Sequence, residues 1–125
     1  MAEDIEVLEA RKNKDNLEYF SDIVMQNGML IEWANEEIRN NKEVILKAVK
    51  NDGGALEFAS NNLKDDKDVL LAATSQAGWT ACYASKRLRN DKQIAIEAVT
   101  KGKKNAFEFI SDELKQDEEI KKILE

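Results

Sequence analysis

The chain is 125 residues long, which suits one domain with a buried core of its own. Its net charge is −6, from 19 basic and 25 acidic residues, and this excess of acid disfavours nucleic acid and anionic membrane surfaces as partners. Histidine is absent, which excludes Ser–His and Cys–His catalytic pairs and every metal site that uses histidine.

The first 15 residues are acidic and highly charged, and residues 3–12 are predicted to form a helix that covers the N-terminal end of the fold. They lack the basic start and the apolar run of a signal peptide. No stretch of the chain approaches the roughly 18 continuous apolar residues that a membrane span requires. The single cysteine, Cys82, excludes an internal disulfide and fits a reducing compartment. We therefore expect a cytoplasmic protein.

Four similar stretches follow one another from residue 16 to residue 116, in blocks of 25 residues with one extra residue in the fourth. Each block repeats a glycine, an aromatic residue, a branched aliphatic residue and a basic residue. The glycines are Gly28, Gly53, Gly78 and Gly102, and the aromatic residues are Trp33, Phe58, Tyr83 and Phe109. This period predicts a stack of helical units that bury their apolar faces against one another.

Each block is predicted to contain two short helices, and the first of them begins after a polar capping residue. The second block shows its apolar face at Val44, Ile45, Ala48 and Val49. The recurring glycine is expected to end this helix in the left-handed conformation. The predicted capping residues are Asp15, Asn40, Asp65, Asn90 and Gln116.

The second helix of the block carries Leu56, Ala59 and Leu63 on one stripe. Phe58 lies beside that stripe, so the apolar arc is wide and is expected to contact neighbours on two sides. We therefore predict an all-α protein of nine or ten short helices, arranged as a short α-solenoid or a compact helical bundle. The whole chain, 1–125, is expected to be one domain, with repeats 16–40, 41–65, 66–90 and 91–116 between capping helices at 1–15 and 117–125.

The repeats resemble a bacterial helical-repeat family known as domain of unknown function 4116. The segments that carry the resemblance are NKEVILKAVKNDGGALEFASNNLKDDK at 41–67 and DKDVLLAATSQAGWTACYASKRLRNDK at 66–92. Two looser copies extend it over residues 16–116. The resemblance implies a helical repeat and no assigned activity, so it supplies no functional residues.

Two rows of repeated residues are candidates for binding. The four aromatic residues are interpreted as core, next to Ala34, Ala59 and Ala84, whose small side chains permit close packing. The alternative is a ladder on which a ligand stacks. The row of Glu32, Glu57 and Glu108 is interpreted as a solvated face, with a cation or a basic partner as the alternative.

The third block departs most from the repeat, at Trp79, Cys82, Lys86 and Arg87. Residues 66–90 hold four basic and two acidic residues, whereas residues 16–40 hold one basic and five acidic residues. Trp79, Cys82 and Lys86 are spaced to share one helical side, so these four residues are the candidate partner-binding site. The alternative is that Trp79 packs under the next unit and the cations pair with acids of flanking repeats.

The favoured function is a non-catalytic protein-interaction module, since repeat stacks present extended surfaces. We expect a protein or peptide partner, no nucleic acid or membrane partner, no cofactor, no metal and no enzyme activity. One alternative is an acidic immunity or inhibitor-type protein that sequesters a basic partner. Others are a structural fragment of a longer repeat array and, least favoured, an enzyme with paired carboxylates in a pocket. The inhibitor alternative would use Glu32, Glu36, Glu37 and Glu57.

Overall fold

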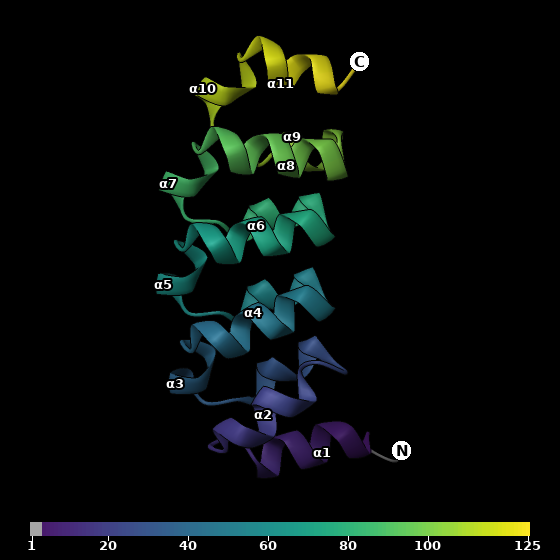
Figure 1. Ribbon diagram of the computed structural model, residues 1–125, viewed down its shortest axis with the longest axis vertical. Helices are drawn as coiled ribbons and strands as arrows, with labels where there is room; N and C mark the ends of the chain where they lie inside the picture. Colours follow the sequence, from purple (N-terminus) through teal and green to yellow (C-terminus); the bar gives the residue numbers. More distant parts are fainter. Residues whose placement is uncertain (1–3) are drawn as a thin grey trace.

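A computed structural model describes residues 4–125 and shows helices without strands over that range. Figure 1 shows the repeated units stacked one above another along the long axis, with the N-terminus and the C-terminus at opposite ends. The all-α repeat fold is therefore confirmed, in the form of an open stack. The predicted N-terminal helix is α1 (Ile5–Lys12), and residues 1–3 of that prediction lie outside the described residues.

Each of the first three units contains a long helix, a 3-10 helix and a short α-helix, in that order, and the fourth has an α-helix in place of the 3-10 helix. The first unit has α2 (Leu17–Ile23), η1 (Gly28–Trp33) and α3 (Glu36–Arg39), and the second has α4 (Lys42–Asn51), η2 (Gly53–Phe58) and α5 (Asn61–Lys64). The third has α6 (Lys67–Gln76), η3 (Gly78–Tyr83) and α7 (Lys86–Arg89). The fourth has α8 (Lys92–Gly102), α9 (Lys104–Phe107) and α10 (Asp112–Lys115), and α11 (Glu118–Ile123) ends the chain.

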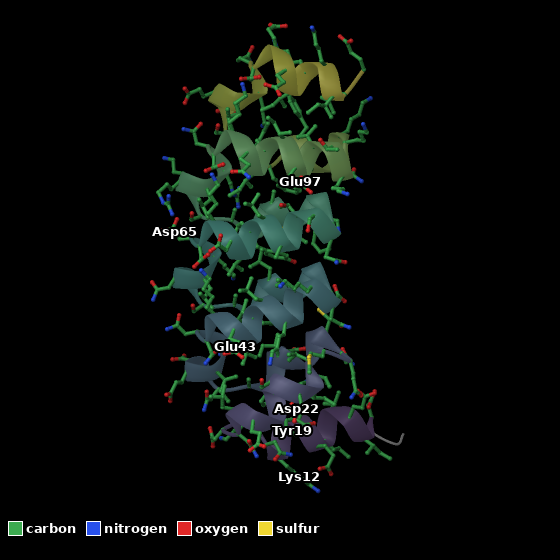
Figure 2. The ribbon with its side chains drawn as sticks, in the orientation of Figure 1. Lys12, Tyr19, Asp22, Glu43, Asp65 and Glu97 are labelled. Carbon is green, nitrogen blue, oxygen red and sulfur yellow. The ribbon has the colours of Figure 1, made fainter. Side chains whose placement is uncertain are left out.

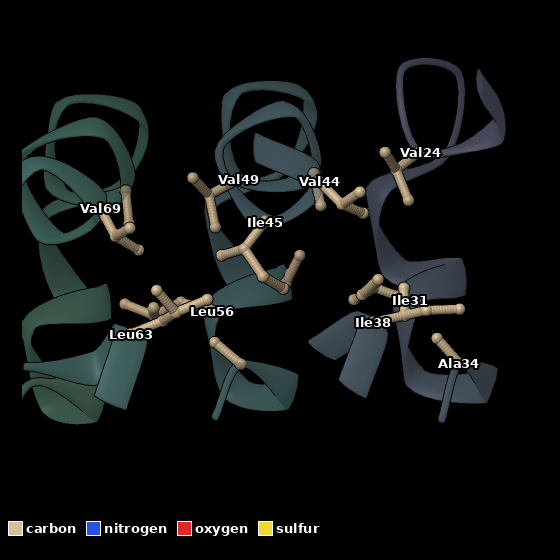
Figure 3. Packing of buried hydrophobic residues seen from close by; sticks show 14 of the residues in the cluster. Val24, Ile31, Ala34, Ile38, Val44, Ile45, Val49, Leu56, Leu63 and Val69 are labelled. Atoms are coloured by element: carbon tan, nitrogen blue, oxygen red, sulfur yellow. The ribbon is translucent and has the colours of Figure 1, made fainter. Parts of the chain in front are cut away.

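The long helices contact one another in one layer and the 3-10 helices contact one another in a second layer. The short helices α3, α5, α7 and α10 line one edge of the stack (Figure 1). Figure 3 shows buried side chains such as Ile45, Val49 and Leu56 filling the space between the layers. The apolar face predicted for α4 is confirmed, because Val44, Ile45, Ala48 and Val49 are all buried.

The predicted second helix of each unit is wrong, since the structure divides it into a 3-10 helix and a short α-helix in the first three units and into two short α-helices in the fourth. In the second unit the division lies at Ala59, whose backbone is extended, with φ −69° and ψ 154°. A 3-10 helix has about three residues per turn. Gly53, Leu56 and Ala59 are three residues apart and all buried, so the 3-10 form turns them to one side. Residues 4–125 consequently hold eleven α-helices and three 3-10 helices, more than the nine or ten predicted.

The predicted capping residues of the long helices are also wrong, by one position. The residues that cap are Asn16, Asn41, Asp66, Asp91 and Asp117, and each accepts a hydrogen bond from a backbone N–H two or three positions later. In α4, for example, Asn41 Oδ1 accepts from the N–H of Val44 at 3.1 Å.

The recurring glycines are required by close packing and not by backbone conformation. No glycine in the described part of the chain has a positive φ, so the prediction that the recurring glycines end the helices in the left-handed conformation is wrong. A Cβ added at Gly78 would lie 2.5 Å from the backbone nitrogen of Gly102 and closer still to the carbonyl oxygen of Ala98. A Cβ at Gly28 would meet the backbone of Ala48 in the same way. These glycines let the long helix of the next unit pack directly against the 3-10 helix.

The fourth unit departs from this pattern at its turn. Gly102 is the last residue of α8, and Lys103 follows it with a φ of 50°, the one positive φ of a non-glycine residue among those described. Lys103 Nζ donates to the carbonyl oxygen of Ile123 at 3.1 Å, which ties this turn to α11. The extra residue of the fourth repeat is therefore accommodated in the turn between α8 and α9.

Candidate interaction surface

Hydrogen bonds between successive units hold the edge formed by the short helices. The backbone N–H of Ser60 donates to the carbonyl of Arg39 at 3.1 Å, and that of Ser85 donates to the carbonyl of Lys64 at 3.0 Å. The hydroxyl of Ser85 also donates to Asp65, at 2.5 Å. Equivalent backbone contacts run from Asn35 to Lys14 and from Ser111 to Arg89. Each unit thereby fixes the position of the next short helix.

A row of ion pairs joins the first turns of the long helices. The pairs are Lys42–Asp66 at 3.0 Å, Lys67–Asp91 at 3.1 Å and Lys92–Asp117 at 3.2 Å. In each pair, the lysine that begins one long helix binds the capping aspartate of the next. The aspartate therefore caps its own helix and anchors the preceding unit.

These contacts lower the pKa values of the capping aspartates. For Asp91 the largest influence is partial burial, which by itself raises the pKa, but hydrogen bonds from the N–H of Ile94 and from Lys67 outweigh it. The same balance lowers the pKa of Asp66, with Lys42 and the N–H of Val69 as donors. The native state therefore holds these carboxyl groups ionised at lower pH than the unfolded chain does.

The free energy of unfolding is expected to fall in acid. A carboxyl whose folded pKa is depressed contributes stability above its unfolded pKa, and the contribution is lost as the pH falls through the folded pKa. Asp91→Asn keeps a good helix cap, as Asn41 shows, but removes the ion pair with Lys67. We expect it to cost roughly 0.5 kcal/mol at neutral pH and to flatten the acid dependence. Thermal unfolding from pH ~5 to ~2 measures this, and superimposable curves for the two proteins would contradict it.

The residues proposed from the third repeat lie on two elements. Trp79 and Cys82 belong to η3, whereas Lys86 and Arg87 begin α7. The expectation that Trp79, Cys82 and Lys86 share one helical side is wrong, because the extended backbone at Ala84 separates the two helices. The structure brings Lys86 and Arg87 together on the short-helix edge and leaves Trp79 and Cys82 in the 3-10 layer.

Arg87 bridges two units. Its Nε lies 3.0 Å from Asp65 Oδ1, and its Nη2 donates to the Asp65 carbonyl at 2.8 Å. Figure 2 shows Asp65 on the edge where the short helices lie. The pairing of a third-repeat cation with a flanking acid is thus present for Arg87. Lys86 is exposed and forms no ion pair within residues 4–125.

Trp79 and Cys82 sit in a different setting. Trp79 is 42% exposed and meets Tyr83 edge to face, with ring centroids 5.9 Å apart. Cys82 is half-buried, and desolvation raises the pKa of its thiol even though Arg89 acts in the opposite direction. At neutral pH this thiol is therefore protonated, which weakens it as a nucleophile.

The aromatic row is half-buried and packs against the core, so its interpretation as core holds only in part. Cations lie over two of its rings: Arg11 is 5.4 Å from the centroid of Trp33, and Lys64 Nζ is 5.9 Å from that of Tyr83. Glu57, from the exposed glutamate row, faces Tyr83. Desolvation raises the pKa of the Tyr83 phenol, and the charge and hydrogen bond of Glu57 raise it further. The row thus joins neighbouring units and has ring surface open to solvent.

The first two residues of every short helix are exposed, and they form what we call the edge pairs. All the surrounding positions repeat in kind: the capping residue, the buried aliphatic and the basic residue at the end of the helix. The edge pairs do not repeat, and their charge changes from acidic to neutral to basic to acidic along the stack. In order they are Glu36/Glu37, Asn61/Asn62, Lys86/Arg87 and Asp112/Glu113.

Hollows lie between the short helices that carry these pairs. One of about 620 Å³ is lined by Glu36, Glu37 and Arg39 from one unit and by Phe58 and residues 59–62 from the next. Another, of about 500 Å³, is lined by residues of α7 and α10 and by the capping residues Asn90 and Ser111 beside them. Between α5 and α7, Arg87 reaches across to Asp65, so its side chain joins the second and third units at the edge.

A family comparison matches the repeats. The family model described as a domain of unknown function (DUF4116) matches residues 16–64, 41–89 and 66–115. The chain belongs to the DUF4116 family. The three DUF4116 matches begin 25 residues apart, at the capping residues Asn16, Asn41 and Asp66, so each match spans two successive units. No curated protein and no solved structure matches the chain.

The described residues lack two further features. No helix in residues 4–125 is long and apolar enough to cross a membrane. No group of three acidic or cysteine side chains in the same range is arranged to hold a metal ion. The short-helix edge, with its edge pairs and hollows, is a surface on which the units differ in charge.

Proposed function

We propose that this DUF4116 stack is a non-catalytic protein-interaction module of the cytoplasm, and that its partner binds the short-helix edge. The observation that carries the proposal is the change of charge among the edge pairs while the positions around them repeat. Residues that hold a repeat fold together are constrained to recur, whereas residues that recognise a partner are free to differ between units. The edge pairs are exposed and take no part in the core, so packing does not dictate their charge, although Arg87 also pairs with Asp65 of the preceding unit.

A charge that changes sign along one edge favours binding of a partner with the complementary order of charges. A partner whose charges oppose those of the edge pairs gains steering and register, and one whose charges match them is repelled. Lys86 and Arg87 of the third repeat therefore belong to the proposed surface. Trp79 and Cys82 lie on η3 and belong to a different surface. The bait experiment below distinguishes binding at that surface from binding at the short-helix edge.

The test is recovery of a partner from a lysate of the source cells with three baits. These are the wild type, Lys86→Glu/Arg87→Glu, and a control, Lys101→Glu/Lys104→Glu, with the same change of net charge at the turn from α8 into α9. We expect one partner on the wild type and the control, and about tenfold less of it on the edge variant, because reversing exposed charges costs about 1–2 kcal/mol.

Folding of all baits is verified by circular dichroism and thermal unfolding, since Arg87 also pairs with Asp65. Equal recovery on all three baits would contradict the proposal. A fourth bait, Trp79→Ala, tests the 3-10 layer. Loss of the partner on this bait alone would move the site to the surface of η3.

A further inference from the structure

The short-helix edge has a regular geometry that matches an extended chain. The short helices follow one another along the edge at the spacing of the stacked units (Figure 1). Packed helices lie about 8–10 Å apart, and an extended chain advances about 3.3 Å per residue. One unit of the stack therefore corresponds to about three residues of an extended segment that runs along the edge.

The hollows supply hydrogen-bonding groups suited to a peptide backbone. The hollow between α3 and α5 is lined by Asn61 and Asn62, whose exposed side chains form no hydrogen bond with other residues of the described range 4–125. Carboxamide groups both donate and accept, so they can pair with the N–H and C=O of a bound chain. In the hollow between α7 and α10, Ser111 donates its hydroxyl to Asn90 Oδ1, which leaves the amide N–H groups of Asn90 and the carboxylate of Glu113 to face a bound chain.

The charges of the edge pairs define the order of charges in the occupant. From α3 to α10 the pairs are acidic, uncharged, basic and acidic. A complementary segment is basic opposite α3, polar opposite α5, acidic opposite α7 and basic opposite α10. Arg87 is already held by Asp65, so the exposed Lys86 supplies the free positive charge in the third unit.

Resting on the proposed function, we infer that the short-helix edge binds one extended polypeptide segment whose basic, polar, acidic and basic residues recur about every three positions. Charge order sets the register of this segment, and the side-chain amide groups of the hollows hold its backbone. A folded protein docking through a flat surface is the competing occupant.

The test is calorimetric titration of synthetic peptides of about ten residues, the length that spans the four edge pairs. The ordered peptide has arginine at both ends, glutamine at its fourth position and glutamate at its seventh, with glycine and serine between them. The rearranged peptide has the same composition, but its first arginine and its glutamate have exchanged places. Each peptide is made in both chain directions and measured at low salt, because screening weakens exposed charge pairs.

We expect the ordered peptide to bind the wild type about tenfold more tightly than the rearranged one. Lys86→Glu/Arg87→Glu is expected to weaken the ordered peptide by a similar factor, and replacing the peptide's glutamate by arginine to restore binding to this variant. Lys101→Glu/Lys104→Glu is the control and leaves the affinity unchanged.

Equal affinity for the ordered and rearranged peptides would overturn the inference, as would failure of every peptide to bind. If the lysate partner still depends on the edge pairs in that case, the proposed function stands and the occupant is a folded protein. If neither the peptides nor the lysate partner responds to the edge variants, the proposed function fails as well.

Discussion

Gly78→Ala is expected to lower the free energy of unfolding by about 3 kcal/mol, near the upper end for forcing an added methyl group into a packed interior. The added Cβ would lie 2.5 Å from the backbone nitrogen of Gly102 and closer still to the carbonyl oxygen of Ala98. Both are backbone atoms of the fourth unit and cannot turn aside as a side chain would. The third and fourth units must separate to make room, which exposes the apolar surface between them.

Gly54→Ala is the matched control, because Gly54 is also buried and is the second residue of the same kind of 3-10 helix. Its nearest neighbour would be Asp52 Oδ1, 3.2 Å away, an exposed side-chain atom that accepts from the N–H of Gly54 and can shift by a few tenths of an ångström. We expect a change within about 1 kcal/mol of the wild type. Urea unfolding of both variants measures the difference. Equal stabilities would show that the glycines are not required for close packing of the units.

Leu56→Ala is expected to destabilise the protein by about 3 kcal/mol, since Leu-to-Ala changes in a core cost about 2–5 kcal/mol. Leu56 is fully buried and lies between the two layers (Figure 3). Its neighbours belong to a core that extends through successive units. A cavity there weakens the packing on both sides of the second unit.

Leu17→Ala makes the same chemical change at a site that is 46% exposed in the first turn of α2. It is expected to cost less than about 1 kcal/mol. Thermal and urea unfolding of the two variants are compared directly. If Leu17→Ala were the more damaging change, the assignment of the core to the space between the layers would be wrong.

The repeat and its core could be predicted from the sequence because their signals are local. The apolar residues of α4 recur at helical spacing, and each unit repeats them about 25 positions later. The capping residues are misplaced because two adjacent polar residues, such as Asp65 and Asp66, are equally good caps. Contacts between units decide between them: Asp65 accepts from Ser85, and Asp66 caps its own helix.

The division of the predicted second helix at Ala59 also has a signal in the sequence, but the α-helical spacing of the apolar residues hides it. Gly53, Leu56 and Ala59 recur every three residues, the period of a 3-10 helix, and Ser60 follows as a strong capping residue. Leu63 continues the apolar pattern beyond the break, so one longer helix also fits it. The same spacing occurs in the first and third units, which strengthens the signal where three copies are compared.

The candidate surface was only partly predictable. The basic character of Lys86 and Arg87 is visible in the sequence as a departure from the other repeats. Trp79 departs from them as well, but the break at Ala84 places it on another element. The alignment of the edge pairs and the hollows between them depends on how the units stack, which no single repeat specifies.

The central claim is that a partner lies along the short-helix edge, and backbone amide chemical-shift mapping tests it most directly. The ordered peptide is titrated into isotopically labelled protein, and the shifts are followed residue by residue. The account predicts the largest changes at α3, α5, α7 and α10, with little change at Met25, Trp79 and Lys101 near the opposite ends of the long helices. Changes centred on η1 and η3, or none at saturating peptide, would contradict it.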